Sequence, residues 1–241
     1  MINALTAITR GTRWVYQPGL RRYIFFPIVV NFIVYAGLIS FVWQRFNGWL
    51  AYWMSLVPGW LEWLSWLIWP LFLISLIAVV FFSFTVVTHL IAAPFYGFLA
   101  AKVETRATGK APIDDRGLAR TAIDTLKREM LKLGYILPRM LVLFVISWIP
   151  VLNLLAPFLW ALFSAWVLAI TYLDYPMDNN KVSFADMRLR LSARWWHSLS
   201  YGGLVMLLTL IPLANLFLLP GAVAGAVLMW DGHYRQPAPS R

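Results

Sequence analysis

Hydrophobic residues gather into four long uncharged runs that are separated by basic segments. The first run, Tyr23 to Gln44, has 22 residues. As a helix it reaches about 33 Å, which matches a bilayer hydrocarbon core of about 30 Å. The second run, Trp63 to Ala101, has 39 residues and is long enough for a crossing with further turns. The pattern therefore predicts two transmembrane helices, one at 23–44 and one at 63–101 with an extension.

The remaining two runs, 140–173 and 195–230, have 34 and 36 residues. Two crossings need about 40 residues plus a turn and one crossing needs about 20, so neither number of crossings fits well. Near its middle each run is interrupted by a similar sequence, Ile-Pro-Val-Leu-Asn-Leu in the first and Ile-Pro-Leu-Ala-Asn-Leu in the second. Because proline ends a helix and asparagine favours a turn, we expect two re-entrant helical hairpins with arms too short to cross fully. One long kinked crossing in each run is the alternative.

Tryptophan and helical periodicity describe the segments between the runs. Seven of the 14 Trp lie between positions 43 and 69, which predicts an interfacial connection at 45–62. Within 102–139 apolar residues recur at helical spacing, which predicts an amphipathic helix that lies on the membrane or packs on a partner subunit. Charged residues on a solvated face over an apolar seam would explain the same pattern. Its apolar positions are Ala119, Ile123, Leu126, Met130, Leu133 and Leu137, and its polar positions are Arg120, Asp124, Lys127, Arg128 and Lys132.

The N-terminal segment, 1–22, shows the same kind of amphipathic pattern on a smaller scale. Leu5, Ile8, Thr12 and Val15 recur at helical spacing, which predicts a short helix with these residues on one face.

Composition and charge agree with an all-α integral membrane protein. Of the 241 residues 61% are hydrophobic and 12% are charged, whereas a soluble domain has about 25% charged residues. If both hairpins return to the side on which they begin, 19 of the 20 basic residues share one side and Arg45 is the exception. The positive-inside rule then places 1–22, 102–139, 174–194 and the tail 231–241 in the cytoplasm. The formal net charge of +10 therefore indicates orientation rather than a nucleic-acid partner.

Signals for an enzyme are weak. The chain has no cysteine, its three histidines are scattered, and it contains neither a phosphate-binding loop nor a nucleophile motif. Asp174 and Asp178 have helical spacing, but Pro176 lies between them, and we expect turn and cap residues rather than an acid–base pair. We expect no catalytic residue, no metal and no cofactor.

The strongest local signal for ligand binding is Gln17-Pro18-Gly19-Leu20-Arg21-Arg22, where the first membrane helix begins. Proline suits the first turn of a helix, and glycine allows an anion to approach the backbone. The free N–H groups of a helix start and two guanidiniums together favour an anion. Paired basic residues also flank many membrane helices, so a plain positive-inside anchor is the simpler interpretation from these residues alone.

Several motifs in order along the chain resemble the CysZ family of bacterial sulfate permeases. The matching segments are Gly19-Leu20-Arg21-Arg22 with Pro27 and Asn31, Ile91 to Phe95 with Lys102-Val103-Glu104, Leu137-Pro138-Arg139, Phe163 to Trp166, Asp174 to Asn179 with Lys181 to Phe184, and Ile211-Pro212 with Asn215. The resemblance covers nearly the whole chain.

The membrane topology that the resemblance implies agrees with the topology predicted from the lengths of the uncharged runs. It implies a multi-pass protein of the bacterial cell inner membrane, with two long helices and two hemi-penetrating hairpins, that brings sulfate into the cytoplasm for cysteine biosynthesis. It assigns sulfate contact to Gly19, Leu20, Arg21 and Arg22. Many relatives are expected to have histidine where this chain has Asn180.

Sulfate is a dianion and needs a wet route lined with donors. Two full helices and two half-hairpins cannot enclose such a route alone, so we expect a homo-oligomer in the lipid bilayer. Few ionisable residues lie within the spans, which favours a channel-like permease over a proton-coupled symporter. A non-transport membrane scaffold and a membrane-embedded enzyme using Asp174, Asp178 and His197 are further alternatives. Candidate pore-lining residues are Glu104, Arg106, Arg139, Asn153 and Asn215. Ion pairing is the simpler explanation for the three charged residues, and satisfaction of broken backbone is the simpler explanation for the two asparagines.

Overall fold

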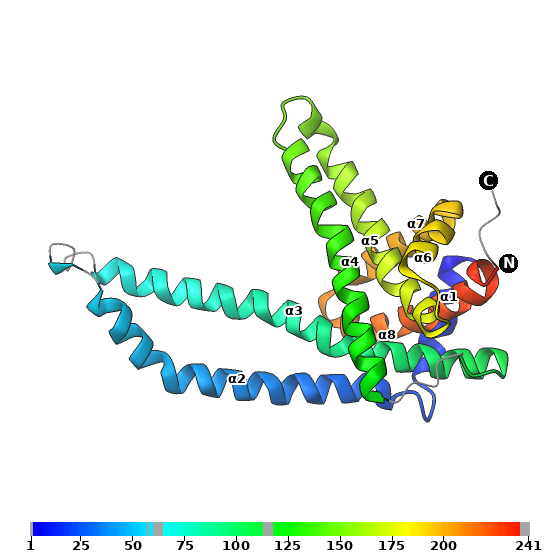
Figure 1. Cartoon of the computed structure of the whole chain (residues 1–241), viewed down its shortest axis with the longest axis horizontal. Coiled ribbons are helices and arrows are strands. Elements are labelled where there is room, and N and C mark those ends of the chain that lie inside the picture. Colours follow the sequence, from blue (N-terminus) through cyan, green and yellow to red (C-terminus); the bar gives the residue numbers. More distant parts are fainter. Residues whose placement is uncertain (1, 57, 60–64, 113–117, 237–241) are drawn as a thin grey trace. The chain divides into compact units, whose positions relative to one another are not determined.

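The computed structural model describes residues 2–56, 58–59, 65–112 and 118–236, and every regular element in these ranges is a helix. The predicted all-α class is therefore confirmed. Part of the predicted interfacial connection, residues 57 and 60–62, lies outside the described residues. In chain order the elements are α1 (Ala4–Val15), α2 (Arg22–Ser55), α3 (Ser65–Thr108), α4 (Leu118–Ile146), η2 (Leu152–Leu155), α5 (Ala156–Asn179), α6 (Phe184–Ala193), α7 (Trp195–Thr209), α8 (Pro212–Met229) and η3 (Trp230–Tyr234) (Figure 1).

The chain forms two compact units, of which the smaller comprises Phe26–Ala92 and holds most of α2 and the first part of α3. The segment Ile28–Ser55 is long and apolar enough to cross a membrane. Large apolar side chains such as Phe32 and Ile33 are 75% and 63% exposed, as expected for a surface in contact with lipid. The predicted first crossing lies in α2, which runs on past Arg45 through the start of the predicted connection.

The predicted second crossing, 63–101, falls mostly within α3, a helix of 44 residues. Its length exceeds the roughly 20 residues that one crossing needs, so the helix can cross and extend beyond the bilayer. Many of its side chains, among them that of His89, lie outside the description, and the crossing stays a prediction.

The larger unit comprises Met1–Phe25 and Ala93–Arg241 and contains both predicted hairpins. In the first hairpin the chain breaks between α4 and α5, where the proline and asparagine of the first interrupted run predicted a break. Its arms are longer than the uncharged run suggested, since α4 has 29 residues and α5 has 24. Leu152–Asn179 is itself long and apolar enough to span a membrane. The premise that both arms are too short to cross is therefore wrong for this hairpin.

The second hairpin, α7 and α8, has arms of 15 and 18 residues. These reach about 22 and 27 Å, less than the roughly 30 Å of a hydrocarbon core. Gly202 of α7 packs against the backbone of Ala165 in α5 so closely that a Cβ atom there would overlap the Ala165 carbonyl. Small residues thus set the distance between α5 and α7, as is usual for packed membrane helices.

The predicted N-terminal helix is present as α1, and Asn3 caps it by accepting a hydrogen bond from the Thr6 amide at 2.8 Å. It packs on α8, where Gly11 meets the backbone around Gly221 and Gly225. The buried residues of α1 are Ala4, Ala7, Ile8, Gly11 and Val15. Leu5 is 60% exposed, so it does not share the buried environment of Ile8 and Val15.

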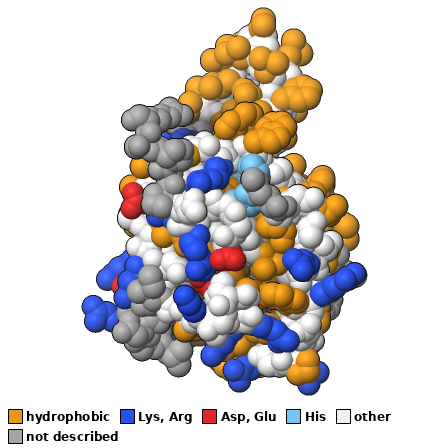
Figure 2. All heavy atoms as spheres, turned by 90° about the vertical axis from the view of Figure 1, so that its right-hand side faces the viewer, with side chains coloured by type: hydrophobic (Ala, Val, Ile, Leu, Met, Phe, Trp, Pro, Cys, Tyr) orange, Lys and Arg blue, Asp and Glu red, His pale blue; other side chains and the backbone are white. Residues whose placement is uncertain are grey.

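The amphipathic pattern of 118–139 lies in α4, where Arg120 and Lys127 are exposed as predicted but Arg128 and Lys132 are buried. Ile123, Leu126, Met130, Leu133 and Leu137 are 38–56% exposed, whereas Arg128, Glu129 and Lys132 are at most 9% exposed. A solvated charged face over an apolar seam is therefore wrong for Arg128 and Lys132 and for the exposed apolar residues, whereas it agrees with the exposure of Arg120 and Lys127. Figure 2 shows hydrophobic side chains covering the projecting end of the larger unit, which Figure 1 identifies as the α4–α5 hairpin. An apolar exterior around buried charges is the arrangement that a protein adopts in lipid.

Candidate functional site

The predicted anion site lies in the turn that joins α1 to α2. Gly19 has φ +92°, a conformation that glycine adopts without the steric cost of a Cβ atom. Nothing lies within 4 Å of a Cβ atom placed there, so backbone conformation alone requires the glycine. The Leu20 side chain is 5% exposed and its amide donates to the Gln17 carbonyl at 3.2 Å. The buried leucine anchors a turn that leads directly into α2 at Arg22.

The donors around this turn face outward. Arg21 and Arg22 are exposed, and the Arg22 Nη2 lies 3.4 Å from the hydroxyl of Tyr23. The Leu20 amide is already engaged within the turn, and it is not available to an anion. Among the described residues no hydrogen bond uses the amides of Gly19, Arg21 or Arg22. Two exposed guanidiniums and three backbone N–H donors thus lie at this helix start, and such donors suit an anion.

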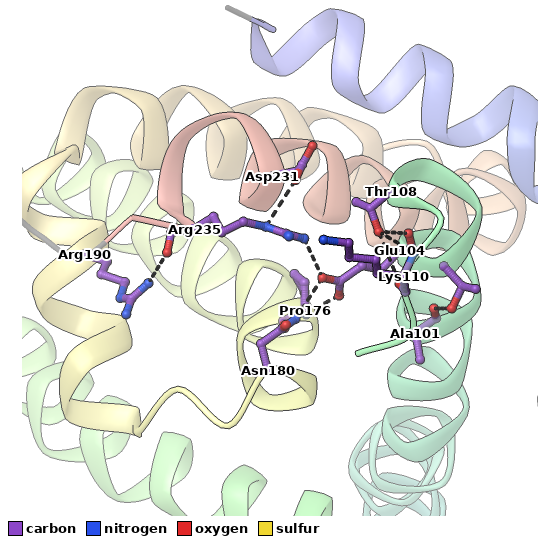
Figure 3. A network of polar contacts seen from close by, with 10 residues as sticks. Ala101, Glu104, Thr108, Lys110, Pro176, Asn180, Arg190, Asp231 and Arg235 are labelled. Carbon is purple, nitrogen blue, oxygen red and sulfur yellow. Dashed lines mark hydrogen bonds and ion pairs between the residues drawn. The ribbon is translucent and has the colours of Figure 1, made fainter. Parts of the chain in front are cut away.

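A second polar site surrounds Glu104, a predicted pore residue near the end of α3 (Figure 3). Its carboxylate is 2% exposed and accepts hydrogen bonds from Asn180 Nδ2 at 2.8 and 3.0 Å. Arg235 Nη2 donates to the same carboxylate at 2.9 Å, and its Nε lies 3.2 Å from Asp231 Oδ1. Burial raises the pKa of Glu104, and the hydrogen bond from Asn180 and the charge of Arg235 only partly offset this effect. Three separate segments of the chain thus meet at Glu104.

The other predicted pore residues do not join this network. Arg106 and Arg139 are exposed, and Arg139 Nη1 donates to the Tyr135 carbonyl at 2.8 Å. Asn153 is exposed in η2, at the turn of the first hairpin. The side chain of Asn215 lies outside the description. Within the described part of one chain, no hydrogen bond or ion pair joins these residues to one another.

A buried ion cluster joins α4 to α5, and sequence reasoning missed it. Asp174 is 1% exposed and accepts hydrogen bonds from Arg128 Nε at 3.0 Å and Nη2 at 2.7 Å. Lys132 Nζ lies 3.3 Å from the other Asp174 oxygen and 2.6 Å from Glu129 Oε1. These four residues, Arg128, Glu129, Lys132 and Asp174, are the α4–α5 ion cluster. Their formal charges cancel, so the cluster ties the two helices together without a net demand for an anion.

The predictions for Asp174 and Pro176 are wrong. Proline 176 lies inside α5, which continues to Asn179, and Asp174 is a buried partner of two cations rather than a turn or cap residue. Asp178 is 21% exposed, and its carboxylate lies 3.9 Å from Arg128 Nε. Two features of the sequence could have indicated this cluster. Asp174 follows directly after an apolar run, and Arg128, which lies 46 residues before it, is spaced by one helical turn from Lys132.

The histidines and carboxylates do not suggest a metal centre. Within the described ranges no group of three or more His, Asp or Glu side chains is placed to hold a metal ion. The ring centres of His197 and His233 lie 4.5 Å apart with the rings tilted by 38°, and His233 Nε2 lies 2.6 Å from the Ile2 carbonyl oxygen. His233 therefore ties the two ends of the chain together.

Comparison with known proteins gives one consistent result. Residues 7–220 match the family described as sulfate transporter CysZ/etoposide-induced protein 2.4. A protein named sulfate transporter CysZ from Pseudomonas fluorescens is 50% identical over 226 residues, which are 92% of this chain and 91% of the relative. A second protein of that name from another strain is 48% identical, with 92% and 89% coverage. One from Pseudomonas aeruginosa is 43% identical over 91% of both chains. These relatives are named as transporters and not as enzymes.

Proposed function

The chain belongs to the sulfate transporter CysZ/etoposide-induced protein 2.4 family, and we propose that it transports sulfate across the bacterial inner membrane into the cytoplasm. The observation that carries this proposal is the similarity to proteins named sulfate transporter over nine-tenths of the chain. The imported sulfate feeds the biosynthesis of cysteine.

In this proposal sulfate binds at the start of α2. Arg21 and Arg22 supply charge, the amides of Gly19, Arg21 and Arg22 supply hydrogen bonds, and Leu20 holds the turn in place. The exposed guanidiniums and the left-handed Gly19 support this assignment. An oxyanion gains from the partial positive charge of the helix start and from charge-assisted hydrogen bonds.

The proposed topology has both termini in the cytoplasm, two crossings in α2 and α3, a first hairpin, α4–α5, that returns to the side on which it begins, and a re-entrant second hairpin, α7–α8. The one-sided distribution of basic residues supports this orientation. The arms of α7 and α8, which are shorter than a hydrocarbon core, support re-entry for the second hairpin. The outward apolar face of α4 supports contact of the region 118–139 with lipid or with a partner subunit.

The sulfate route in this proposal is wet and lies between subunits of a homo-oligomer or along the hairpins. Glu104, Arg106, Arg139, Asn153 and Asn215 are its proposed lining. The buried Glu104 with its partner Arg235 is the best placed of these to respond to an anion, because a passing sulfate competes with the carboxylate for the guanidinium.

Passive, channel-like passage is favoured over proton-coupled symport. A symporter commonly has a titrating carboxylate within its spans. The one acidic residue in the candidate span Leu152–Asn179 that is fully enclosed is Asp174, and two cations already neutralise it. A scaffold without transport activity is the remaining alternative.

Uptake of radiolabelled sulfate into proteoliposomes tests the proposal. Arg21→Ala with Arg22→Ala is compared with Arg10→Ala with Arg13→Ala, which removes the same charge from exposed positions of the neighbouring α1. We expect uptake to fall at least about tenfold only in the first variant, since each charge-assisted hydrogen bond contributes about 1.5–3 kcal/mol. Equal uptake by both variants would reject the site. Uptake that follows a pH gradient and ignores the membrane potential would support symport, and absence of uptake by the unmodified protein would favour the scaffold.

A further inference from the structure

The larger unit has a second basic pocket, separate from the turn at Gly19. It lies between α4, α5 and α6, and its volume is about 320 Å³. Cavities that bind small molecules have volumes of roughly 300–1,000 Å³. The lining side chains are Tyr135, Trp166, Ala185, Arg188, Leu189 and Ser192.

Arg188 is the central cation of this pocket, and it has no anionic partner in the part of the chain that the structure describes. Its Nε atom is buried without a hydrogen-bond partner. Its guanidinium lies over the rings of Tyr135 and Phe184, at 5.0 and 5.4 Å from their centres. Aromatic faces hold the cation in position but accept no hydrogen bond from Nε, so this buried donor lacks an acceptor.

Further donors converge on the same place. Trp166 Nε1 donates to the Tyr135 hydroxyl oxygen at 3.4 Å, which leaves the Tyr135 O–H free to donate in turn. A second guanidinium, that of Arg139, lies 3.7 Å from the centre of the Tyr135 ring. The Arg188 guanidinium and the Tyr135 hydroxyl, which line the same pocket, are recognition elements of a tetrahedral oxyanion.

The surroundings of the pocket are apolar rather than aqueous. Val142 lies two helical turns beyond Tyr135 along α4, and Leu162 lies one turn beyond Trp166 along α5, both toward the end of the hairpin. Their side chains are 59% and 56% exposed, and Leu189 at the pocket itself is 61% exposed. An oxyanion site that continues into exposed apolar surface suits a ligand with a charged head and a hydrocarbon tail.

The beginning of α7 marks the depth of the pocket in the membrane. Trp195 and Trp196 directly follow the basic α6 segment, are 55% and 68% exposed, and pack edge to face. Exposed tryptophan beside arginine is typical of the headgroup level of a bilayer. Basic pockets between helices at the cytoplasmic surface bind the headgroups of anionic lipids.

We propose that the pocket between α4, α5 and α6 binds the phosphate of an anionic phospholipid, with Arg188 as its main cation. The Tyr135 hydroxyl completes the headgroup site, and the lipid tail lies on Val142 and Leu162. The inference needs only a membrane location, so it stands or falls independently of sulfate transport.

Native mass spectrometry of the delipidated full-length protein tests this site. Phosphatidylglycerol and phosphatidylcholine with identical acyl chains are added separately to the unmodified protein, to Arg188→Gln and to the charge-matched control Arg10→Gln. We expect tighter binding of phosphatidylglycerol than of phosphatidylcholine. Arg188→Gln should weaken phosphatidylglycerol binding about fivefold to tenfold, as one cation near anionic lipid contributes about 1 kcal/mol and a direct bond adds to it. Equal loss in both variants would overturn the assignment.

Two further measurements separate lipid from free anion and from misfolding. Millimolar sulfate or phosphate should leave the phosphatidylglycerol adduct of the unmodified protein intact. Displacement by either ion would show a site for free oxyanions and would overturn the lipid assignment. Ser192→Trp fills the pocket from its exposed side while Arg188 is retained. It should also lose the adduct, and retention of the adduct by a folded Ser192→Trp would reject the pocket.

Discussion

Replacing Asp174 by asparagine removes the acceptor that holds Arg128 and Lys132 in the α4–α5 ion cluster. The carboxylate is 1% exposed, and three cationic nitrogens lie 2.7–3.3 Å from its oxygens. After the change Lys132 still has Glu129 at 2.6 Å, but Arg128 has only the more distant Asp178. One guanidinium therefore stays buried without a close counter-charge.

The expected cost follows from that burial. Removal of one partner from a buried pair destabilises a protein by about 3–5 kcal/mol, whereas exposed or distant pairs contribute about 0–1 kcal/mol. For a chain of this size 1 kcal/mol corresponds to roughly 2–4 °C, so Asp174→Asn should lower Tm by about 6–20 °C. Asp178→Asn is the matched control, because this carboxylate is 21% exposed and lies 3.9 Å from Arg128 Nε. It should lower Tm by less than about 4 °C.

Thermal unfolding in detergent, followed by circular dichroism, measures both variants. A third variant, Arg128→Met with Asp174→Leu, removes the pair together and should be more stable than Asp174→Asn, because it leaves no unpaired buried charge. If Asp174→Asn and Asp178→Asn unfold within about 2 °C of each other, the cluster does not stabilise the hairpin and the reasoning fails.

Three smaller perturbations follow from the same structure. Because burial raises the pKa of Glu104, the folded state holds its proton more tightly than the unfolded state. The stability of the unmodified protein should therefore fall as pH rises from the ordinary pKa of 4.5 through the raised pKa. The Tm of Glu104→Gln should not show this dependence on pH. Parallel pH profiles of Tm in the two proteins would contradict a raised pKa at Glu104. Gly202→Ala should lower Tm by several degrees because its Cβ atom overlaps Ala165, whereas Gly203→Ala meets open space and should be neutral or stabilising. Gly19→Ala should cost about 1 kcal/mol in unfolding measurements through its positive φ alone, and an unchanged stability would show that the turn adapts.

Local features of the fold could be predicted from the sequence because their causes are local. Proline and asparagine mark the break after α4, and glycine between proline and leucine marks the turn before α2. The start of α2 at Arg22 follows from the same few residues.

Helix ends and helix orientation were harder to predict. The uncharged run ended at Leu173, yet α5 continues to Asn179 because Arg128 and Lys132 neutralise Asp174 within the protein. The periodicity of α4 separates an apolar face from a polar one, but it does not say which face is buried. In the structure Arg128 and Lys132 are buried while Leu126 and Met130 are exposed, an arrangement that lipid favours and water does not.

The site around Glu104 could be predicted only in part. Glutamate 104 stands out as an acidic residue at the end of an apolar run. Its partners Asn180 and Arg235 are 76 and 131 residues away along the chain, and no spacing rule connects them. Tertiary packing brings them together.

The most direct measurement is equilibrium binding of radiolabelled sulfate to the purified protein, with phosphate and chloride as competitors. We expect saturable sulfate binding that the Arg21→Ala, Arg22→Ala variant loses and the Arg10→Ala, Arg13→Ala variant retains. Sulfate binding of equal strength in both variants would contradict a sulfate site at the start of α2.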